Sequence, residues 1–347
     1  MSYIKWQHHT PPAANILERT PELIAAGTVV KANAVRKVIK SGDYFIKIDL
    51  RPTHPFTGEF AIAQALTGAG IPVVEHLACG SDGNANYLIT RALPDAVELA
   101  EMRDTIVPDE KFLHPLCDFL TAFANSNFIH NDFHCGNILY ANGRFTLVDV
   151  RAVRRKWWWD QCRLHPGAFH PLAEFRSRLS ASKMQELFTR CGIRDARKFY
   201  RRMWQECAAA LFKEWEKRKT QLFAAYPKFS TLQGDKLCRT RSKVELSCCR
   251  EFTSPLAAEV FALGLFLELA GIPSSPVVAV DLANQKYFLA PAGNGVPGAA
   301  AISEADENLA CFKLSLPPEL WGLSPDGMAA VTSPEAMEHL AKQLPLS

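Results

Sequence analysis

Three polar side chains stand at fixed spacing in the apolar segment FIHNDFHCGNILYANGRFTLVDV, residues 128–150. Asp132 and Asn137 fall in a predicted loop, and Asp149 ends a predicted strand. A carboxylate beside an apolar run is costly unless an opposite charge meets it. Mg²⁺ takes one or two carboxylates and leaves its other positions to water and phosphate oxygens. The pattern therefore indicates a metal–nucleotide site, in which Asp132 orients an acceptor hydroxyl while Asn137 and Asp149 hold the metal.

Phosphoryl transfer also needs a cation on the phosphates, and a lysine in a predicted strand is the candidate. Lys47 stands within YFIKID, where an apolar residue would be the default. Farther along the chain, Glu59 is the acidic residue of the helix predicted to pack on that strand. Because a lysine on a central strand is costly without a carboxylate, we expect Glu59 to pair with Lys47 and direct its amine toward phosphate.

The elements that must position these residues follow from periodicity and turn chemistry. Three short strands are predicted at residues 27–30, 35–40 and 44–49. A helix follows and ends near Gly68 and Gly70, and two more strands flank the turn SDGNA. From Glu98 to about Tyr226 the pattern is mostly helical. The fold class is therefore α+β, with a small antiparallel sheet that carries one helix, followed by a helical part.

The last third of the chain echoes the first. Residues 252–292 and 56–93 each contain a helix with a glutamate (Glu259 and Glu59), then Gly-Ile-Pro, then two strands across a polar turn. We interpret this as a partial duplication, and chance similarity of local structure is the alternative. No copy of the Asp132 segment follows, so the second unit would be half a domain.

Together these residues resemble the catalytic set of the protein-kinase-like superfamily. The histidine two residues after Asp132, in HNDFHCGN, is similar to the small-molecule and lipopolysaccharide branches of that superfamily. The stretch EFAIAQALTGAGIPVV from Glu59 and the basic run after Asp149 most resemble the lipopolysaccharide kinase family that acts on Kdo or heptose. The resemblance covers Gly27 to about Arg202.

The resemblance implies a bilobal kinase-like fold that uses ATP and Mg²⁺. It implies a small lobe over residues 1–92 and a helical lobe over 93–230, and the internal repeat predicts a partial second small lobe over 231–347. Three departures stand out. No G-x-G-x-x-G joins the first strands, Asn131 replaces the usual glycine, and Val-Arg follows Asp149 instead of Phe-Gly. The missing glycine loop places more of the phosphate binding on Lys47 and the metal.

Charge is unevenly distributed along the chain. Residues 151–230 hold 19 Lys or Arg against 7 Asp or Glu, although the net charge of the whole chain is +3. This basic segment fits an anionic acceptor such as lipopolysaccharide core or another anionic glycolipid. The expected acceptor-binding residues are His134, Arg151, Arg154, Arg155 and Lys156. The run RRKWWWD also predicts peripheral contact with an anionic membrane face, and no nucleic-acid motif is visible.

Other features exclude function classes. The polar N-terminal sequence argues against export, and the most apolar window, residues 257–272, is too short to cross a bilayer. The ten cysteines form no CxxC pair, so we expect reduced thiols and a cytoplasmic protein. The resemblance implies that it acts at the cytoplasmic face of the inner membrane of a Gram-negative bacterium. Two alternatives stay open. One is a small-molecule kinase of the aminoglycoside or choline type, and the other is a non-catalytic pseudokinase scaffold.

Overall fold

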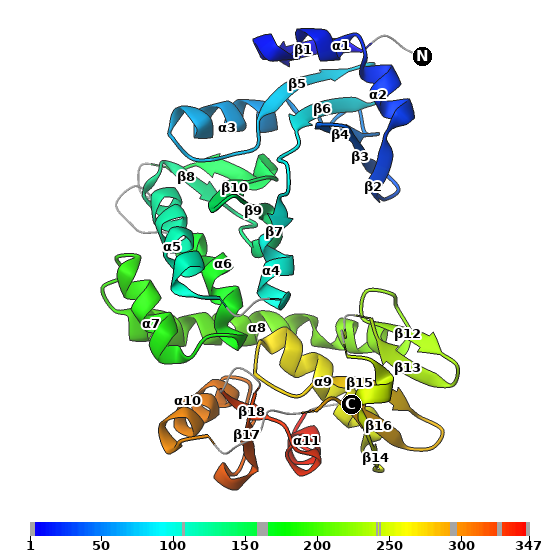
Figure 1. Ribbon diagram of the computed structural model, residues 1–347, viewed down its shortest axis with the longest axis vertical. Helices are drawn as coiled ribbons and strands as arrows, with labels where there is room; N and C mark the ends of the chain where they lie inside the picture. Colours follow the sequence, from blue (N-terminus) through cyan, green and yellow to red (C-terminus); the bar gives the residue numbers. More distant parts are fainter. Residues whose placement is uncertain are drawn as a thin grey trace. The chain divides into compact units, whose positions relative to one another are not determined.

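The computed structural model describes residues 4–105, 108–157, 166–240, 242, 244–291, 297–324 and 328–344 (Figure 1). The chain divides into two compact units, residues 1–172 and 173–347. The lobe boundaries expected at residues 92 and 230 are not tested by this division into compact units. They stay predictions.

The first unit begins with a six-stranded antiparallel sheet in the order β1-β5-β6-β4-β3-β2. Its strands are β1 (Lys5–His9), β2 (Thr28–Ala32), β3 (Arg36–Ser41), β4 (Tyr44–Asp49), β5 (His76–Ser81) and β6 (Asn86–Arg91). The five strands expected from the sequence are all present. Strand β1 was not expected, because its mostly exposed side chains (KWQHH) carry no alternating apolar pattern.

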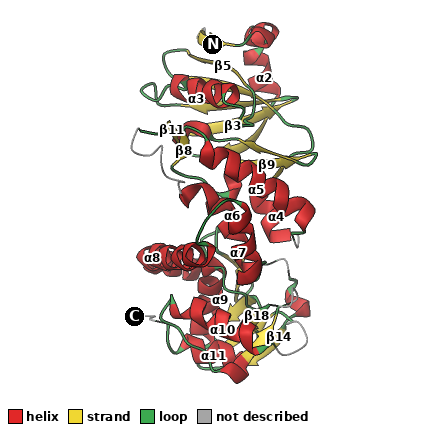
Figure 2. Ribbon diagram, turned by 90° about the vertical axis from the view of Figure 1, so that its left-hand side faces the viewer, coloured by secondary structure: helices red, strands yellow, loops and turns green. Residues whose placement is uncertain are grey.

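Three helices accompany this sheet: α1 (Ala14–Leu17), α2 (Thr20–Ala26) and α3 (Thr57–Gly68). Helix α3 runs along the sheet and buries Phe60, Ala63 and Leu66, as their helical spacing requires (Figure 2). Phe60 shares a core cluster with Leu88 of β6. Burying these side chains fixes the rotation of α3, and Glu59 is buried with them.

The rest of the first unit is mostly helix with short hairpins. Its elements are β7 (Val97–Glu98), α4 (Leu99–Thr105), α5 (Glu110–Asn125), β8 (Phe128–His130), η2 (Cys135–Asn137), β9 (Ile138–Ala141), β10 (Arg144–Leu147), η3 (Val150–Ala152), β11 (Val153–Arg155) and η5 (Pro166–Phe169). The side chain of Asp109 caps α5 by accepting from the amide of Phe112. Strands β8 and β9 flank the loop that carries Asp132 and Asn137, and Asp149 follows β10.

The second unit packs long helices around a five-stranded antiparallel sheet in the order β12-β13-β15-β16-β14. Its helices are η6 (Glu174–Ser177), α7 (Ala181–Arg190), α8 (Ala196–Phe223), η7 (Leu246–Cys248), α9 (Ala257–Ala270), α10 (Ala299–Ala310), η8 (Pro318–Leu320) and α11 (Pro334–Ala341), and α6 (His170–Ala173) spans the boundary. Its strands are β12 (Ser230–Gln233), β13 (Lys236–Arg239), β14 (Arg250–Thr253), β15 (Val277–Asp281), β16 (Lys286–Leu289), β17 (Trp321–Leu323) and β18 (Ala329–Val331). Helix α9 is buried on nearly all sides, which explains its almost uniformly apolar sequence.

Two sequence expectations can be compared with the described residues. The nine cysteines among them are free thiols. No described helix is long and apolar enough to cross a membrane.

Candidate active site

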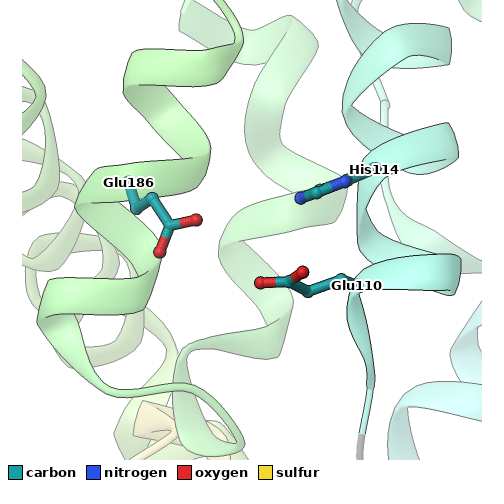
Figure 3. A group of neighbouring side chains, drawn as sticks. All are labelled: Glu110, His114 and Glu186. Atoms are coloured by element: carbon teal, nitrogen blue, oxygen red, sulfur yellow. The ribbon is translucent and has the colours of Figure 1, made fainter.

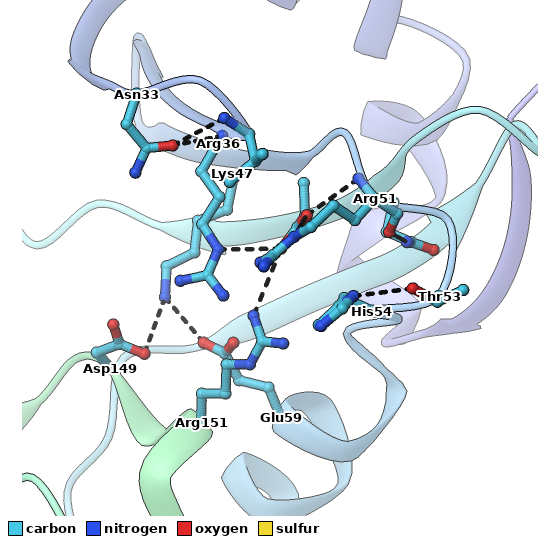
Figure 4. Close-up of polar contacts among 12 residues, drawn as sticks. Asn33, Arg36, Lys47, Arg51, Thr53, His54, Glu59, Asp149 and Arg151 are labelled. Atoms are coloured by element: carbon cyan, nitrogen blue, oxygen red, sulfur yellow. Dashed lines mark hydrogen bonds and ion pairs between the residues drawn. The ribbon is translucent and has the colours of Figure 1, made fainter.

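Lys47 and Glu59 form the expected ion pair. The Nζ of Lys47 on β4 donates to Oε1 of Glu59 on α3 at 2.8 Å (Figure 4). The Glu59 side chain is 2% exposed, whereas the lysine is 25% exposed. The Glu59 carboxylate is therefore more deeply buried than the lysine side chain that pairs with it. The same ammonium group lies 3.7 Å from Oδ1 of Asp149.

A buried histidine supports Glu59 from the other side. His76 on β5 donates through Nδ1 to the carbonyl of Val74, and its Nε2 lies 3.7 Å from Oε1 of Glu59. Burial alone would raise the pKa of Glu59, but His76 and Lys47 outweigh it and lower that pKa to about 2. The pKa of Lys47 is raised in spite of burial, because Glu59 and Asp149 favour its charged form. Lysine and glutamate are therefore both ionised at neutral pH.

The loop before β9 is held by its own histidines. His130 accepts the amide of Asp132 at Nδ1 and donates through Nε2 to the carbonyl of Asp149, so it links the loop to the segment after β10. Burial lowers the pKa of His130, which fits this neutral, structural role. His134 accepts the amide of Gly136 at Nδ1 and lies 3.8 Å from the Asp132 carboxylate through Nε2.

Asp132 and Asn137 differ in exposure. The Asp132 side chain is 74% exposed, so an acceptor can reach it. Asn137 is buried, and its Nδ2 donates to the main-chain carbonyl of Asp132 at 2.7 Å. Because this bond occupies the amide nitrogen, the amide oxygen is the atom left for a ligand. Asp149, 55% exposed, supplies the carboxylate. This donor set fits Mg²⁺.

Another group of acidic and histidine side chains does not give a metal site. Glu110 and His114 lie one turn apart on α5 of the first unit, and Glu186 lies on α7 of the second (Figure 3). Only Glu110 and His114 belong to the same unit, and two protein ligands are too few for a metal site. We therefore assign no metal to this group.

Three arginines around one buried carboxylate form a feature that sequence reasoning missed. Asp49 is fully buried; Nε of Arg36 and Nη2 of Arg51 lie 2.9 and 2.7 Å from its Oδ2, and Nη1 of Arg151 lies 3.5 Å away (Figure 4). Hydrogen bonds from Arg51 and then Arg36 hold the pKa of Asp49 well below its usual range. Lys47 and Asp49 lie two apart on β4, so they share a face of the sheet.

A signal for this cluster was present in the sequence. Arg36 lies directly opposite Asp49 in the β3–β4 ladder. The two-residue turn of SGD fixes that register, so the pair could have been found by counting outward from the turn.

The expected acceptor-binding residues have different surroundings. Arg151 contacts Asp49 and so lies at the ion-pair cluster. Lys156 donates from Nζ to the carbonyl of Ala124 near the end of α5, which gives it a structural contact. Arg154 donates to the carbonyl of Arg155, and both lie on β11. In the run RRKWWWD, Trp157 is 58% exposed, while residues 158–160 lie outside the described residues.

No family model and no curated protein matches the chain. Among solved structures, WaaP in complex with acyl carrier protein is 17% identical, with a TM-score of 0.41, over 62% of this chain and 98% of that one. The streptomycin–ATP ternary complex of APH(2")-IIa is 10% identical, with a TM-score of 0.39, over 60% and 94%. WbdD with a kinase inhibitor is 24% identical, with a TM-score of 0.29, over 37% and 33%.

The topology and paired side chains of the first unit decide the fold. An antiparallel sheet carries a lysine paired with a helix glutamate, and a helical part follows with an Asp–Asn loop and a second aspartate. This arrangement is the mixed α+β, kinase-like fold.

Proposed function

We propose that the protein is an ATP-dependent phosphotransferase with an alcohol group as acceptor. The observation that carries this proposal is the position of Lys47, whose ammonium group lies between the carboxylates of Glu59 and Asp149. An ammonium group held in this way can bind phosphate oxygens without losing its charge.

Each residue of the site then has one task. Glu59 holds the Lys47 amine against the phosphates, and Asn137 and Asp149 would hold Mg²⁺, which neutralises phosphate charge when bound. The exposed Asp132 orients the acceptor hydroxyl. The hydroxyl oxygen forms a bond to the γ-phosphorus as the bond to the β-phosphate oxygen breaks; its proton passes to Asp132, and ADP leaves.

Arginine charge supports phosphate binding in a chain that has no glycine-rich loop. Arg36 directly follows the turn between β2 and β3 and lies on the same face of the sheet as Asp49 and Lys47. Arg51 and Arg151 contact the same aspartate, so three cations surround one carboxylate. The excess positive charge beside Lys47 favours phosphate oxygens.

The acceptor that we propose is a sugar hydroxyl of an anionic glycolipid, that of Kdo or heptose in lipopolysaccharide core, reached from the cytoplasmic face of the inner membrane. The arginines near Asp49 support this choice, and so does the basic stretch 151–157 of the same unit, which has four Lys or Arg and no acidic residue. An acceptor pocket for a cationic aminoglycoside or choline would instead be acidic.

Calorimetry with MgATP tests the nucleotide site directly. We expect magnesium-dependent binding that Lys47→Met and Asp149→Asn each weaken at least tenfold. Lys37→Met and Asp43→Asn are matched controls, because both residues are exposed and Lys37 pairs with Ile48, on the opposite face of β4 from Lys47. Equal losses in the controls would contradict the assignment. Transfer from labelled ATP to purified lipopolysaccharide core and to kanamycin would then separate the anionic from the cationic acceptor.

A further inference from the structure

Part of the second unit repeats the strand order around the Lys47 site. In the first unit, α3 joins β4 to β5, and β6 lies between these two strands in the sheet. In the second unit, α9 joins β14 to β15, and β16 lies between them. Both β-hairpins also carry an irregularity at the same place, between His76 and Ala78 of β5 and between Val277 and Ala279 of β15. β-Bulges are specific features of a fold, so a shared bulge extends the correspondence beyond strand order.

The Gly-Ile-Pro segments that follow the two helices make the same main-chain bonds. The amide of Ile71 donates to Leu66 at 3.0 Å, and that of Ile272 donates to Leu267 at 2.9 Å. The amide of Val74 donates to Leu147 and that of Leu147 donates to Pro72, at 2.9 and 3.0 Å. In the second unit, the amide of Ser275 donates to the carbonyl of Val331 at 2.9 Å, and the amide of Val331 donates to that of Pro273 at 3.0 Å. The strand that ends at Val331 therefore corresponds to the strand that ends just before Asp149.

The loop of the active site also has a counterpart. In the first unit, the 3₁₀ turn η2 leads into the β9–β10 hairpin, with α5 packed on β10. In the second unit, η8 leads into the β17–β18 hairpin, with α10 packed on β18. The amide of Asn137 donates to His134 at 3.0 Å, and the amide of Leu320 donates to Pro317 at 3.0 Å.

Each unit also has a hollow beside the proline of its Gly-Ile-Pro segment. In the first unit it has a volume of about 760 Å³ and is lined by Pro72, Ala122 and Phe145, among others. In the second unit, Pro273, Ala305 and Ala329 line a hollow of about 110 Å³. Trp204 of α8 also lines the smaller one.

The matched positions show what became of the catalytic residues. The strand registers and hydrogen bonds match each site residue to one residue of the second unit. Phe252 corresponds to Lys47, and Val260 corresponds to Glu59. Ser315, Leu320 and Ser333 correspond in that order to Asp132, Asn137 and Asp149. Glu259, which the sequence pattern aligned with Glu59, falls one residue earlier and is only half-buried.

The replacements remove each chemical function in turn. The ring of Phe252 stacks on Tyr287 of β16 at 5.5 Å, and Val260 is completely buried. An aromatic ring and an aliphatic side chain thus stand where the first unit buries an ion pair, an exchange that proteins tolerate well. Leu320 offers no ligand atom, and the hydroxyl of Ser333 accepts the amide of Ala336 as the cap of α11. Among the described residues, β14 is an edge strand with no hairpin like β2–β3 beyond it.

We infer that residues 250–341 form a second kinase-like core that binds no nucleotide, so that the full chain holds one MgATP site, in the first unit. The number of sites rests on the proposed function, whereas the lack of a site in the second unit does not. The second unit extends through the loop and hairpin that correspond to the Asp132 segment, and is more than the half-domain expected from the sequence.

The test is calorimetry of the full chain with the Mg²⁺ complex of AMP-PNP, combined with photolabelling by azido-ATP and peptide mapping. We expect one site per chain, label confined to peptides of residues 1–172, and loss of both signals in Asp149→Asn but not in Asp43→Asn. Two sites, or labelled peptides from residues 250–341, would overturn the inference. A wild-type chain that binds nothing and takes up no label would refute the proposed function while agreeing with a second unit that has no site.

Discussion

The two units handle one structural position in opposite ways. Where the first unit buries Glu59 against Lys47, the second packs Val260, and Phe252 stacks on Tyr287. A buried carboxylate needs its partners, and the first unit supplies both an ammonium group and His76. Buried apolar side chains such as Val260 need no partner of opposite charge. This difference is what we expect if the polar residues of the first unit serve the proposed chemistry, because the second unit builds a similar main-chain framework without them.

The largest effect should come from the exposed carboxylate of the loop. We expect Asp132→Asn to lower transfer roughly 10²–10⁴-fold, the range for loss of a general base, with MgATP binding little changed. The matched variant Ser315→Ala in the second unit should leave the rate within about twofold. Initial rates with labelled ATP check both. A comparable loss in Ser315→Ala would place part of the chemistry in the second unit.

The lysine position gives the next largest contrast. Lys47→Met should lower kcat/KM about 10²–10³-fold, because a fixed cation on the transferring phosphate is lost. Phe252→Leu should keep the rate and cost about 1 kcal/mol of unfolding free energy through lost packing. Steady-state kinetics and urea unfolding of the full chain measure the two. A Lys47→Met protein that keeps its full rate would refute the assigned role.

The buried glutamate links the site to acid stability. Its pKa is about 2 in the folded protein against an ordinary value of 4.5. A lowered pKa stabilises the fold above pH 4.5, and this contribution, roughly 3 kcal/mol, is lost as the pH falls toward 2. Glu59→Gln should therefore be less stable than wild type at pH 7, and the gap should narrow below pH 4.5. Urea unfolding between pH 3 and 7 measures it, and a gap that stays constant would contradict the pairing.

The sequence predicted the parts of the site that rest on local pattern. Lys47, Glu59 and the loop residues could be found because their types break the surrounding apolar pattern at recognisable spacings. The arginine contacts of Asp49 were missed because they depend on strand register and on a residue from the segment after Asp149. The matching loop of the second unit escaped notice because Ser315, Leu320 and Ser333 replace the aspartates and the asparagine of the motif, so only hydrogen bonds and topology show it.

The smallest effect concerns a glycine that the two units share. Gly70 and Gly271 precede the Ile-Pro pair with φ of +76° and +72°, so alanine at either is strained by about 1 kcal/mol. A Cβ at Gly70 would meet no atom within 4 Å, whereas at Gly271 it would come within 2.7 Å of Nε of Arg176. That arginine donates to the carbonyls of Ala270 and Ala173 and cannot move without losing those bonds.

Gly271→Ala should therefore destabilise the protein more than Gly70→Ala does, and Arg176→Lys combined with Gly271→Ala should recover part of the difference. Urea unfolding of the full chain compares the three variants. If Gly70→Ala and Gly271→Ala lowered the unfolding free energy equally, Arg176 would have to move away from the new methyl group without cost. That result would contradict the predicted clash at Gly271.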